Sequence, residues 1–215
     1  MNNHQKLSRD IAGFLLQINA IKLNVEYPFT WASGLRSPIY CDNRRTLSYP
    51  KIRNSIASGL ANLVSEHHPE TELIAGVATG AIAHGVLTAS NLNLPFVYVR
   101  SNAKGHGLGN QVEGCFEKNQ KVVVIEDLVS TGKSSMAAIE ALKEAGLNVL
   151  GMVSIFSYNL DVAVEKFRDG NCRFDSLSDY ETLISMALDQ GLISLEQLKE
   201  LQTWRDDPAA WSASH

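Results

Sequence analysis

The chain has 215 residues, 45% of them hydrophobic and 20% charged, with a formal net charge of -4. This length and composition predict one globular domain with a hydrophobic core, and the acidic balance argues against a nucleic-acid-binding protein. Cys41, Cys115 and Cys172 lie far apart, which excludes a disulfide framework or a zinc pattern. No signal core and no apolar run of ~20 residues is present, so we expect a cytoplasmic protein without a membrane segment.

The first part of the chain, residues 1–47, predicts a helix followed by a covering segment. Residues 4–20 place apolar side chains at helical spacing, which predicts an amphipathic helix. Residues 24–47 are dense in Pro, Gly, Ser and aromatic residues, which favours short strands and turns. Because this segment has too much aromatic mass to be left in water, we expect a hood over a site rather than a linker.

The middle part, residues 48–160, alternates between strand and helix patterns. This alternation predicts a doubly wound α/β fold with a central parallel sheet flanked by helices. Consecutive β-branched residues in one strand are typical of a sheet covered on both faces. The expected strands are 73–77, 95–99, 121–125 and 149–156, and the expected helices are 50–66, 80–91 and 133–145.

The last part, residues 161–215, shows helical patterns and no convincing strand. Ser194 and Gln197 have the spacing of a helix-starting capping box. Asp207-Pro208 predicts the start of a last short helix, with Trp211 as its apolar anchor. We expect these helices to pack on the rest, so that residues 1–215 form a single domain.

The strongest functional pattern is a strand, two acids and a loop of small residues that opens a helix. Ligands in open α/β sheets bind at the carboxyl ends of strands, where loop amides and a helix N-terminus form an anion site. Carboxylates beside it can accept hydrogen bonds from ribose hydroxyls and stabilise positive charge on the sugar. The pattern therefore predicts a sugar-phosphate site, whereas the alternative is an ordinary capped helix. Its residues are Glu126, Asp127, Leu128, Val129, Ser130, Thr131, Gly132, Lys133 and Ser134.

This stretch resembles the motif of type I phosphoribosyltransferases that binds phosphoribosyl diphosphate (PRPP), and every position of the motif matches. The resemblance implies the type I phosphoribosyltransferase fold with an N-terminal hood. It also implies that Glu126 and Asp127 hold the ribose hydroxyls and that residues 130–134 hold the 5-phosphate. The loop lacks the upstream glycine of a Walker motif.

A second pattern is a basic, glycine-rich loop at residues 100–110. A cationic loop of this kind can move, close on a diphosphate leaving group and exclude water, although a solvated surface loop is the alternative. Arg100, Lys104 and His106 match the loop of orotate phosphoribosyltransferases, while Ser101 replaces a lysine that many members have. The resemblance implies PRPP contacts by these three residues, and a homodimer in which the loop serves the neighbouring subunit.

The hood sequence, residues 29–44, resembles the N-terminal signature of the same family, in the form typical of Gram-positive bacteria. Stacking groups and amide donors suit a flat, polar anion such as orotate. Ala32 stands where many members have a lysine, so Arg36 is a candidate cation facing the base. Ser130 is the best candidate for a base contact by family position. Residues 75–81 resemble the diphosphate-binding loop of the family.

The resemblance implies the reaction of orotate with PRPP to give orotidine 5-phosphate and diphosphate, a step in pyrimidine (UMP) biosynthesis. Asp127, Lys104, His106 and Glu126 are the candidate catalytic residues. Mg2+ is expected, held mainly by PRPP oxygens and water. One alternative is another base such as a purine, against which the hood argues. The other is a PRPP-sensing regulator, but the N-terminal segment is too short and not basic enough for a DNA-binding module.

Overall fold

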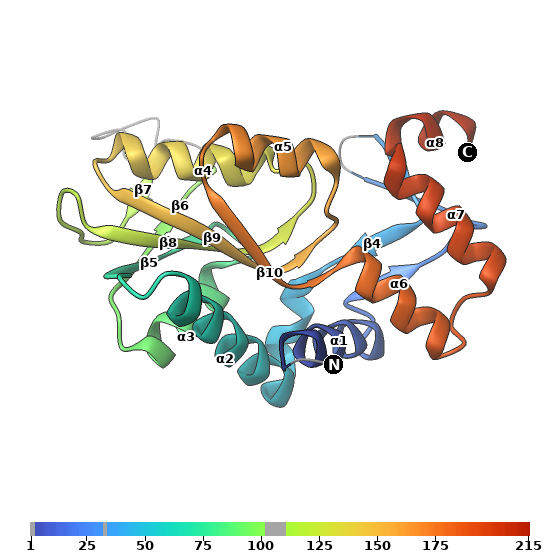
Figure 1. Ribbon diagram of the computed structural model, residues 1–215, viewed down its shortest axis with the longest axis horizontal. Coiled ribbons are helices and arrows are strands. Elements are labelled where there is room, and N and C mark those ends of the chain that lie inside the picture. Colours follow the sequence, from blue (N-terminus) through green and yellow to red (C-terminus); the bar gives the residue numbers. More distant parts are fainter. Residues whose placement is uncertain (1–2, 32–33, 102–110) are drawn as a thin grey trace.

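The computed structural model describes residues 3–31, 34–101 and 111–215, and within them the chain builds a central six-stranded sheet between two layers of helices (Figure 1). Neighbouring strands are parallel, except that β7 pairs antiparallel with β6. This arrangement confirms the predicted α/β class. In spatial order the strands are β10 (Arg173–Asp179), β9 (Asn148–Ser157), β8 (Lys121–Val129), β5 (Leu73–Val77), β6 (Phe96–Val99) and β7 (Val112–Glu113).

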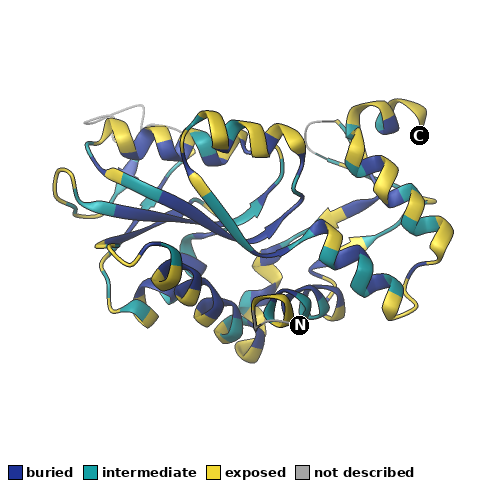
Figure 2. Cartoon of the chain, in the orientation of Figure 1, coloured by how far each residue is buried: buried dark blue, intermediate teal, exposed yellow. Residues whose placement is uncertain are grey.

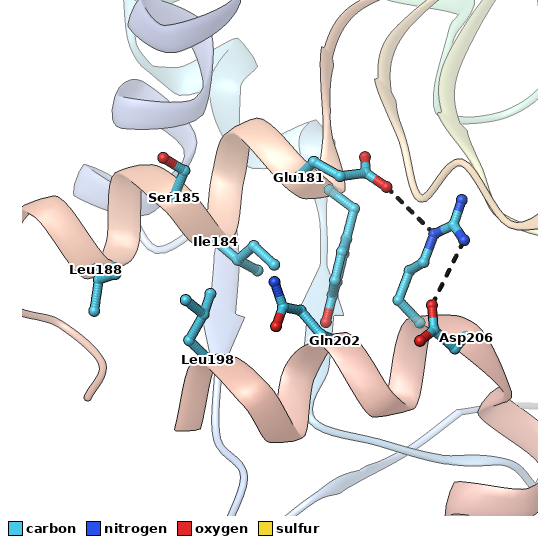
Figure 3. A pocket seen from close by; sticks show the side chains of 9 residues that line it. Glu181, Ile184, Ser185, Leu188, Leu198, Gln202 and Asp206 are labelled. Atoms are coloured by element: carbon cyan, nitrogen blue, oxygen red, sulfur yellow. Dashed lines mark ion pairs between the residues drawn. The ribbon is translucent and has the colours of Figure 1, made fainter. Parts of the chain in front are cut away.

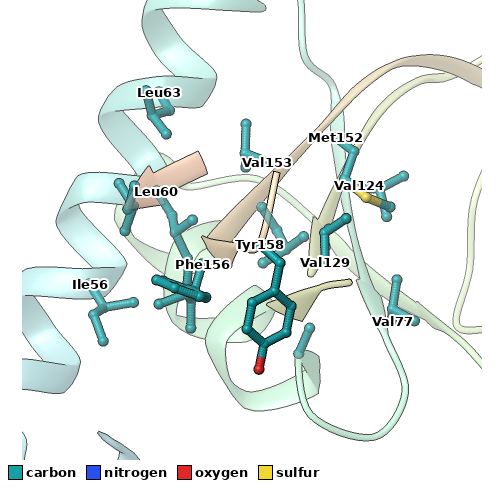
Figure 4. Close-up of a cluster of buried hydrophobic side chains, with 14 of the residues drawn as sticks. Ile56, Leu60, Leu63, Val77, Val124, Val129, Met152, Val153, Phe156 and Tyr158 are labelled. Atoms are coloured by element: carbon teal, nitrogen blue, oxygen red, sulfur yellow. The ribbon is translucent and has the colours of Figure 1, made fainter. Parts of the chain in front are cut away.

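Helices cover both faces of the sheet, which is why its central strands are apolar (Figures 1 and 2). Helices α2 (Pro50–His67) and α3 (Ile82–Leu92) cover one face, and α4 (Lys133–Glu144) and α5 (Asp161–Asp169) cover the other. All residues of β5 are buried. Figure 4 shows the core between α2 and β9, where Leu60 lies close to Phe156.

The other helices lie around the hood. Helix α1 (Asn3–Gln17) packs against β10 and α6 (Tyr180–Asp189), while α7 (Leu195–Asp206) and α8 (Pro208–Ser214) lie at the same end of the molecule as the hood (Figure 1). No described helix combines the length and the apolar character needed to cross a membrane.

The hood consists of short strands and turns, as predicted, and ends in a 3-10 helix. Strand β1 (Ile21–Leu23) pairs with β4 (Ile39–Cys41), β2 (Phe29–Thr30) pairs with β3 (Arg36–Ser37), and η1 (Asn43–Ser48) follows. The ring of Trp31 lies edge-on to that of Trp204 in α7, with centroids 5.8 Å apart. The amide of Arg36 donates to Ser212 Oγ at 2.8 Å. The hood is therefore attached to the last two helices.

The expectation that residues 161–215 contain no strand is wrong, because β10 extends the central sheet beside β9. Strand β10 is at the sheet edge and mixes charged residues and serines with Phe174 and Leu177, so it has no apolar run that could identify it. The capping box of Ser194 and Gln197 and the last helix after Asp207 are both confirmed.

Strand β8 also differs from the prediction, since it continues through the two acids to Val129. Its pairing with β9 reaches Val129 and Ser157, and this pairing keeps the acids in extended backbone. Successive side chains of a strand point to opposite faces of the sheet. Of the two acids, Glu126 is buried and Asp127 is partly exposed.

Candidate active site

The candidate site lies where the strand order of the sheet reverses. The chain passes from β5 to β6 on one side, then crosses to β8 and continues outward to β9 and β10. Ligands of open α/β sheets bind at such a switch point, outside the carboxyl ends of the strands. A cleft of 350 Å3 lies there. It is lined by Cys41, Asp42 and Arg44 of the hood, Val77, Ala78, Thr79 and Gly80 after β5, and Glu126, Asp127, Leu128 and Ser134.

The two acids of β8 differ in environment. Glu126 is 4% exposed and accepts hydrogen bonds from Ser135 Oγ at 3.3 Å and from the Asp127 amide at 3.1 Å. Burial and the neighbouring Asp127 carboxylate raise the pKa of Glu126 well above its ordinary value. Burial also raises the pKa of Asp127, but hydrogen bonds and the Arg44 guanidinium oppose that rise. The two carboxyl groups therefore share an environment that disfavours charge on both, and the rise in pKa is greater for Glu126.

The loop after β8 leads into the start of α4 and leaves backbone amides there without an acceptor among the described residues. Gly132 adopts φ 70°, a left-handed conformation that favours glycine, at the N-cap position. The amides of residues 131–134 donate to no acceptor among the described residues. Thr131, Lys133 and Ser134 are exposed, so a phosphate can reach them. Val129 is fully buried, and its side chain packs in the core instead of facing a ligand (Figure 4).

The turn after β5 adds a second group of amides to the cleft. The amide of Ala78 donates to the Val99 carbonyl at 2.8 Å, which ties the turn to the end of β6. The amides of Thr79 and Gly80 have no acceptor within the described part of the chain. Two sets of donors thus belong to the segments that line the cleft together with Asp127.

The basic loop starts at the carboxyl end of β6. The amide of Arg100 donates to the Gln111 carbonyl at 2.8 Å, and its guanidinium lies 3.4 Å from Glu113 Oε1. Lys104 and His106 lie outside the described residues. Because β5 alone separates β6 from β8, the base of the loop is close to the cleft.

Comparisons with known proteins agree with this geometry. Residues 48–190 match the model of the phosphoribosyl transferase domain family. An orotate phosphoribosyltransferase of Bacillus cytotoxicus is 55% identical over 207 residues, which are 95% of this chain and 99% of the relative. The chain belongs to the orotate phosphoribosyltransferase family. A second relative of that name, from Bacillus cereus, is 54% identical over the same length.

Solved structures confirm the type I phosphoribosyltransferase fold. The orotate phosphoribosyltransferase of Aeropyrum pernix superposes with a TM-score of 0.74 at 28% identity, over 86% of this chain and 99% of that one. The UMP synthase of Leishmania donovani gives a TM-score of 0.79 at 29% identity. This similarity covers 92% of this chain and 42% of that longer chain.

The structure of this orotate phosphoribosyltransferase family member does not place Arg36 in the cleft. The Arg36 amide binds Ser212, and its guanidinium donates to the His215 carbonyl, so the side chain is used to hold the hood. Arg44 is the hood cation that lines the cleft. Its Nε lies 2.6 Å from Asp42 Oδ1, and its charge helps to lower the pKa of Asp42.

Sequence reasoning missed several residues that the fold brings to the site. Arg44 and Asn43 belong to the hood signature and Gly80 to the predicted diphosphate loop, but no role for them followed from residue type. Their role depends on distance to Asp127. That distance depends on how η1 and the turn after β5 pack against β8.

A larger hollow of 540 Å3 lies between α6 and α7, beside the end of the edge strand β10 (Figure 3). Its cation, Arg205, is already paired within the chain. The guanidinium lies 3.3 Å from Glu181, 3.8 Å from Asp206 and 3.3 Å from Asp161. We therefore assign the chemistry to the cleft beside Asp127, where donors remain available.

Proposed function

We propose that the chain transfers the phosphoribosyl group of PRPP to orotate and releases diphosphate, a step in UMP biosynthesis. The observation that supports this proposal best is the Asp127 carboxylate in a cleft that two sets of available amides also border. One set suits the 5-phosphate and the other suits the diphosphate, with the ribose between them. The family of the chain supports the same substrates.

In the proposed reaction, a ring nitrogen of orotate that has lost its proton to solvent attacks C1 of the ribose while the bond from C1 to the diphosphate oxygen breaks. The electron pair of that bond leaves with the diphosphate. Positive charge develops on the ribose, and the carboxylate of Asp127 stabilises it. Lys104 and His106 are the proposed contacts to the leaving diphosphate, together with Arg100 at the base of their loop.

The base would lie against the hood. The ring of Tyr40 is 41% exposed, and its centroid lies 5.7 Å from that of Phe29. Such an aromatic surface suits a flat ring, which stacks with an offset or a tilt. We propose Tyr40 as the stacking residue and Ser130 as a polar contact to orotate.

The residues of the cleft fit Mg2+ that arrives with the substrate. No group of three or more His, Cys, Asp or Glu side chains is placed to hold a metal ion among residues 3–31, 34–101 and 111–215. Mg2+ commonly combines substrate phosphates and water with one or two carboxylates, and Asp127 is available for that role. When bound, the ion would neutralise charge on the diphosphate.

The proposed enzyme is a cytoplasmic homodimer in which the loop of residues 100–110 reaches the neighbouring active site. Strands β6 and β7, which precede and follow the loop in the sequence, lie at one edge of the sheet, where a second subunit can approach (Figure 1). The three free cysteines Cys41, Cys115 and Cys172 suit a reducing compartment.

One assay tests the proposed substrate. Purified protein is incubated with PRPP, Mg2+ and each of orotate, uracil, adenine and xanthine. Orotate should be consumed only when PRPP and Mg2+ are both present. Consumption of a purine in its place would contradict the proposal, whereas tight PRPP binding without consumption of any base would favour a regulator.

A further inference from the structure

Strand β8 extends past its neighbour β5 beside the cleft. The pairing of β5 with β8 ends at Gly76 and Ile125, whereas the pairing of β8 with β9 continues to Val129. On the β5 side, the backbone of β8 therefore has no strand partner near Asp127. A buried carbonyl there needs another donor, because an unpaired backbone group costs free energy.

Asn43 of the hood supplies that donor. Its Nδ2 donates to the Asp127 carbonyl at 2.5 Å, and the residue is 1% exposed. The thiol of Cys41 donates to Asn43 Oδ1 at 3.4 Å, and the hydroxyl of Thr46 donates to the Asn43 carbonyl at 2.6 Å. The Cys41 contact orients the side-chain amide of Asn43 so that its nitrogen points at Asp127, and the Thr46 contact holds the Asn43 backbone.

A buried histidine of α3 supports this arrangement from behind. His84 is 0% exposed, and its Nε2 lies 3.2 Å from Thr46 Oγ1. Since the Thr46 hydroxyl donates its proton to the hydrogen bond with the Asn43 backbone carbonyl, its oxygen accepts a hydrogen bond from His84 Nε2–H. Burial lowers the pKa of His84 to about 4, which keeps the ring neutral at physiological pH.

We infer that Asn43 is a positioning residue that sets the backbone of Asp127, and that Thr46 and His84 hold Asn43 in place. The contact between Asn43 and the Asp127 carbonyl thereby fixes the position of the hood relative to the strand that bears the acid. The inference rests on the proposed function in so far as Asp127 faces the ribose of PRPP. A small misplacement of a reacting group can lower a rate by a large factor.

A double-mutant cycle in PRPP affinity tests this inference without using any base. We expect Asn43→Ala to weaken PRPP binding roughly tenfold, as expected when contacts to a charged group are disturbed. In an Asp127→Asn background the same change should have little effect on PRPP affinity, because Asn43 is inferred to act only by positioning the Asp127 carboxylate, which that background lacks. Equal weakening in both backgrounds, measured by titration calorimetry with Mg2+, would overturn the role of Asn43.

Two further variants control for a general loss of stability. Asn43→Asp keeps the shape but turns a carboxylate oxygen toward the Asp127 carbonyl, so it should weaken PRPP binding at least as much. Thr71→Ala removes a similar bond, from the Thr71 hydroxyl to the His68 carbonyl at 2.6 Å, near the amino end of β5. It should leave PRPP affinity unchanged, and a loss there equal to that of Asn43→Ala would contradict the inference.

The outcome also separates this inference from the proposed function. Wild-type protein that binds PRPP but consumes no orotate would refute the function and leave the affinity cycle valid. With active wild-type protein, kcat for orotate should fall roughly a hundredfold in Asn43→Ala, as for a misplaced catalytic group. Wild-type protein that does not bind PRPP would overturn both.

Discussion

The carboxylate of Asp127 lies directly against the backbone of Gly80. A Cβ built on Gly80 would be 2.7 Å from Oδ1 and 2.5 Å from Cγ of Asp127, closer than real Cβ atoms approach other atoms. The turn after β5 and the acid of β8 thus share one small space. Glycine is needed at this position because of the close approach.

Gly80→Ala should therefore displace the Asp127 side chain. We expect kcat/KM for PRPP to fall roughly a hundredfold from misplacement, with a destabilisation of about 1–3 kcal/mol from overpacking. Gly13→Ala, in helix α1, is the matched control. Its Cβ would lie 3.5 Å from Met186 of α6, an ordinary contact distance. Full activity in Gly80→Ala would show that the carboxylate position does not matter.

Asp127→Asn keeps the shape of the side chain and removes the charge that faces the ribose. We expect kcat to fall by roughly a hundredfold or more if the carboxylate acts as an electrostatic stabiliser. The Tm should change little or rise, because a carboxylate at a ligand site is not there for packing. Preserved activity together with a lower Tm would make Asp127 a structural residue.

Glu126→Gln should change the pH dependence of stability. The unfolded chain loses this proton near pH 4.3, whereas the folded chain keeps it to a higher pH. The stability from Glu126 is therefore fully present below the unfolded pKa and is lost as pH rises through the folded pKa. Because Gln has no proton to lose, the Tm of the variant should exceed that of the wild type increasingly from about pH 5 to pH 8. If Tm changed with pH in the same way in the wild type and the variant, the raised pKa of Glu126 would be refuted.

Trp204 should be needed to hold the hood. It is fully buried and touches the rings of Trp31, Tyr158 and Tyr180. We expect Trp204→Ala to cost about 3–5 kcal/mol in the free energy of unfolding and to raise KM for orotate more than KM for PRPP. Trp204→Phe is the control, because Trp204 Nε1 has no hydrogen-bond partner among the described residues. Equal increases in both KM values would argue against a specific effect on the hood.

Mixed dimers test whether the basic loop serves the neighbouring subunit. Asp127→Asn and Lys104→Ala should each give nearly inactive homodimers. If sites are shared, each mixed dimer has one site with both groups intact. Random reassociation makes about half of the dimers mixed, so activity should return to roughly a quarter of wild type. Confirmed mixed dimers without activity would mean that the loop closes on its own subunit.

Much of the fold and the centre of the site could be predicted from the sequence. The apolar run before Glu126 and the small residues up to Ser134 predict a strand, an anion loop and a helix, because local pattern and helix ends decide them. The motif matches alone indicate the family. The edge strand β10 could not be predicted, since its partly exposed residues lack an apolar pattern.

Tertiary structure alone decided which residues act together. Nothing local distinguishes Glu126 from Asp127, but in the fold Glu126 is buried and Asp127 is partly exposed, and both line the cleft. Asn43 and Gly80 meet Asp127 because the hood and the turn after β5 pack against β8. Likewise, Arg36 holds α8 instead of facing the base. Residue type sets what a group can do, but its protonation and its partners depend on burial and distance across the fold.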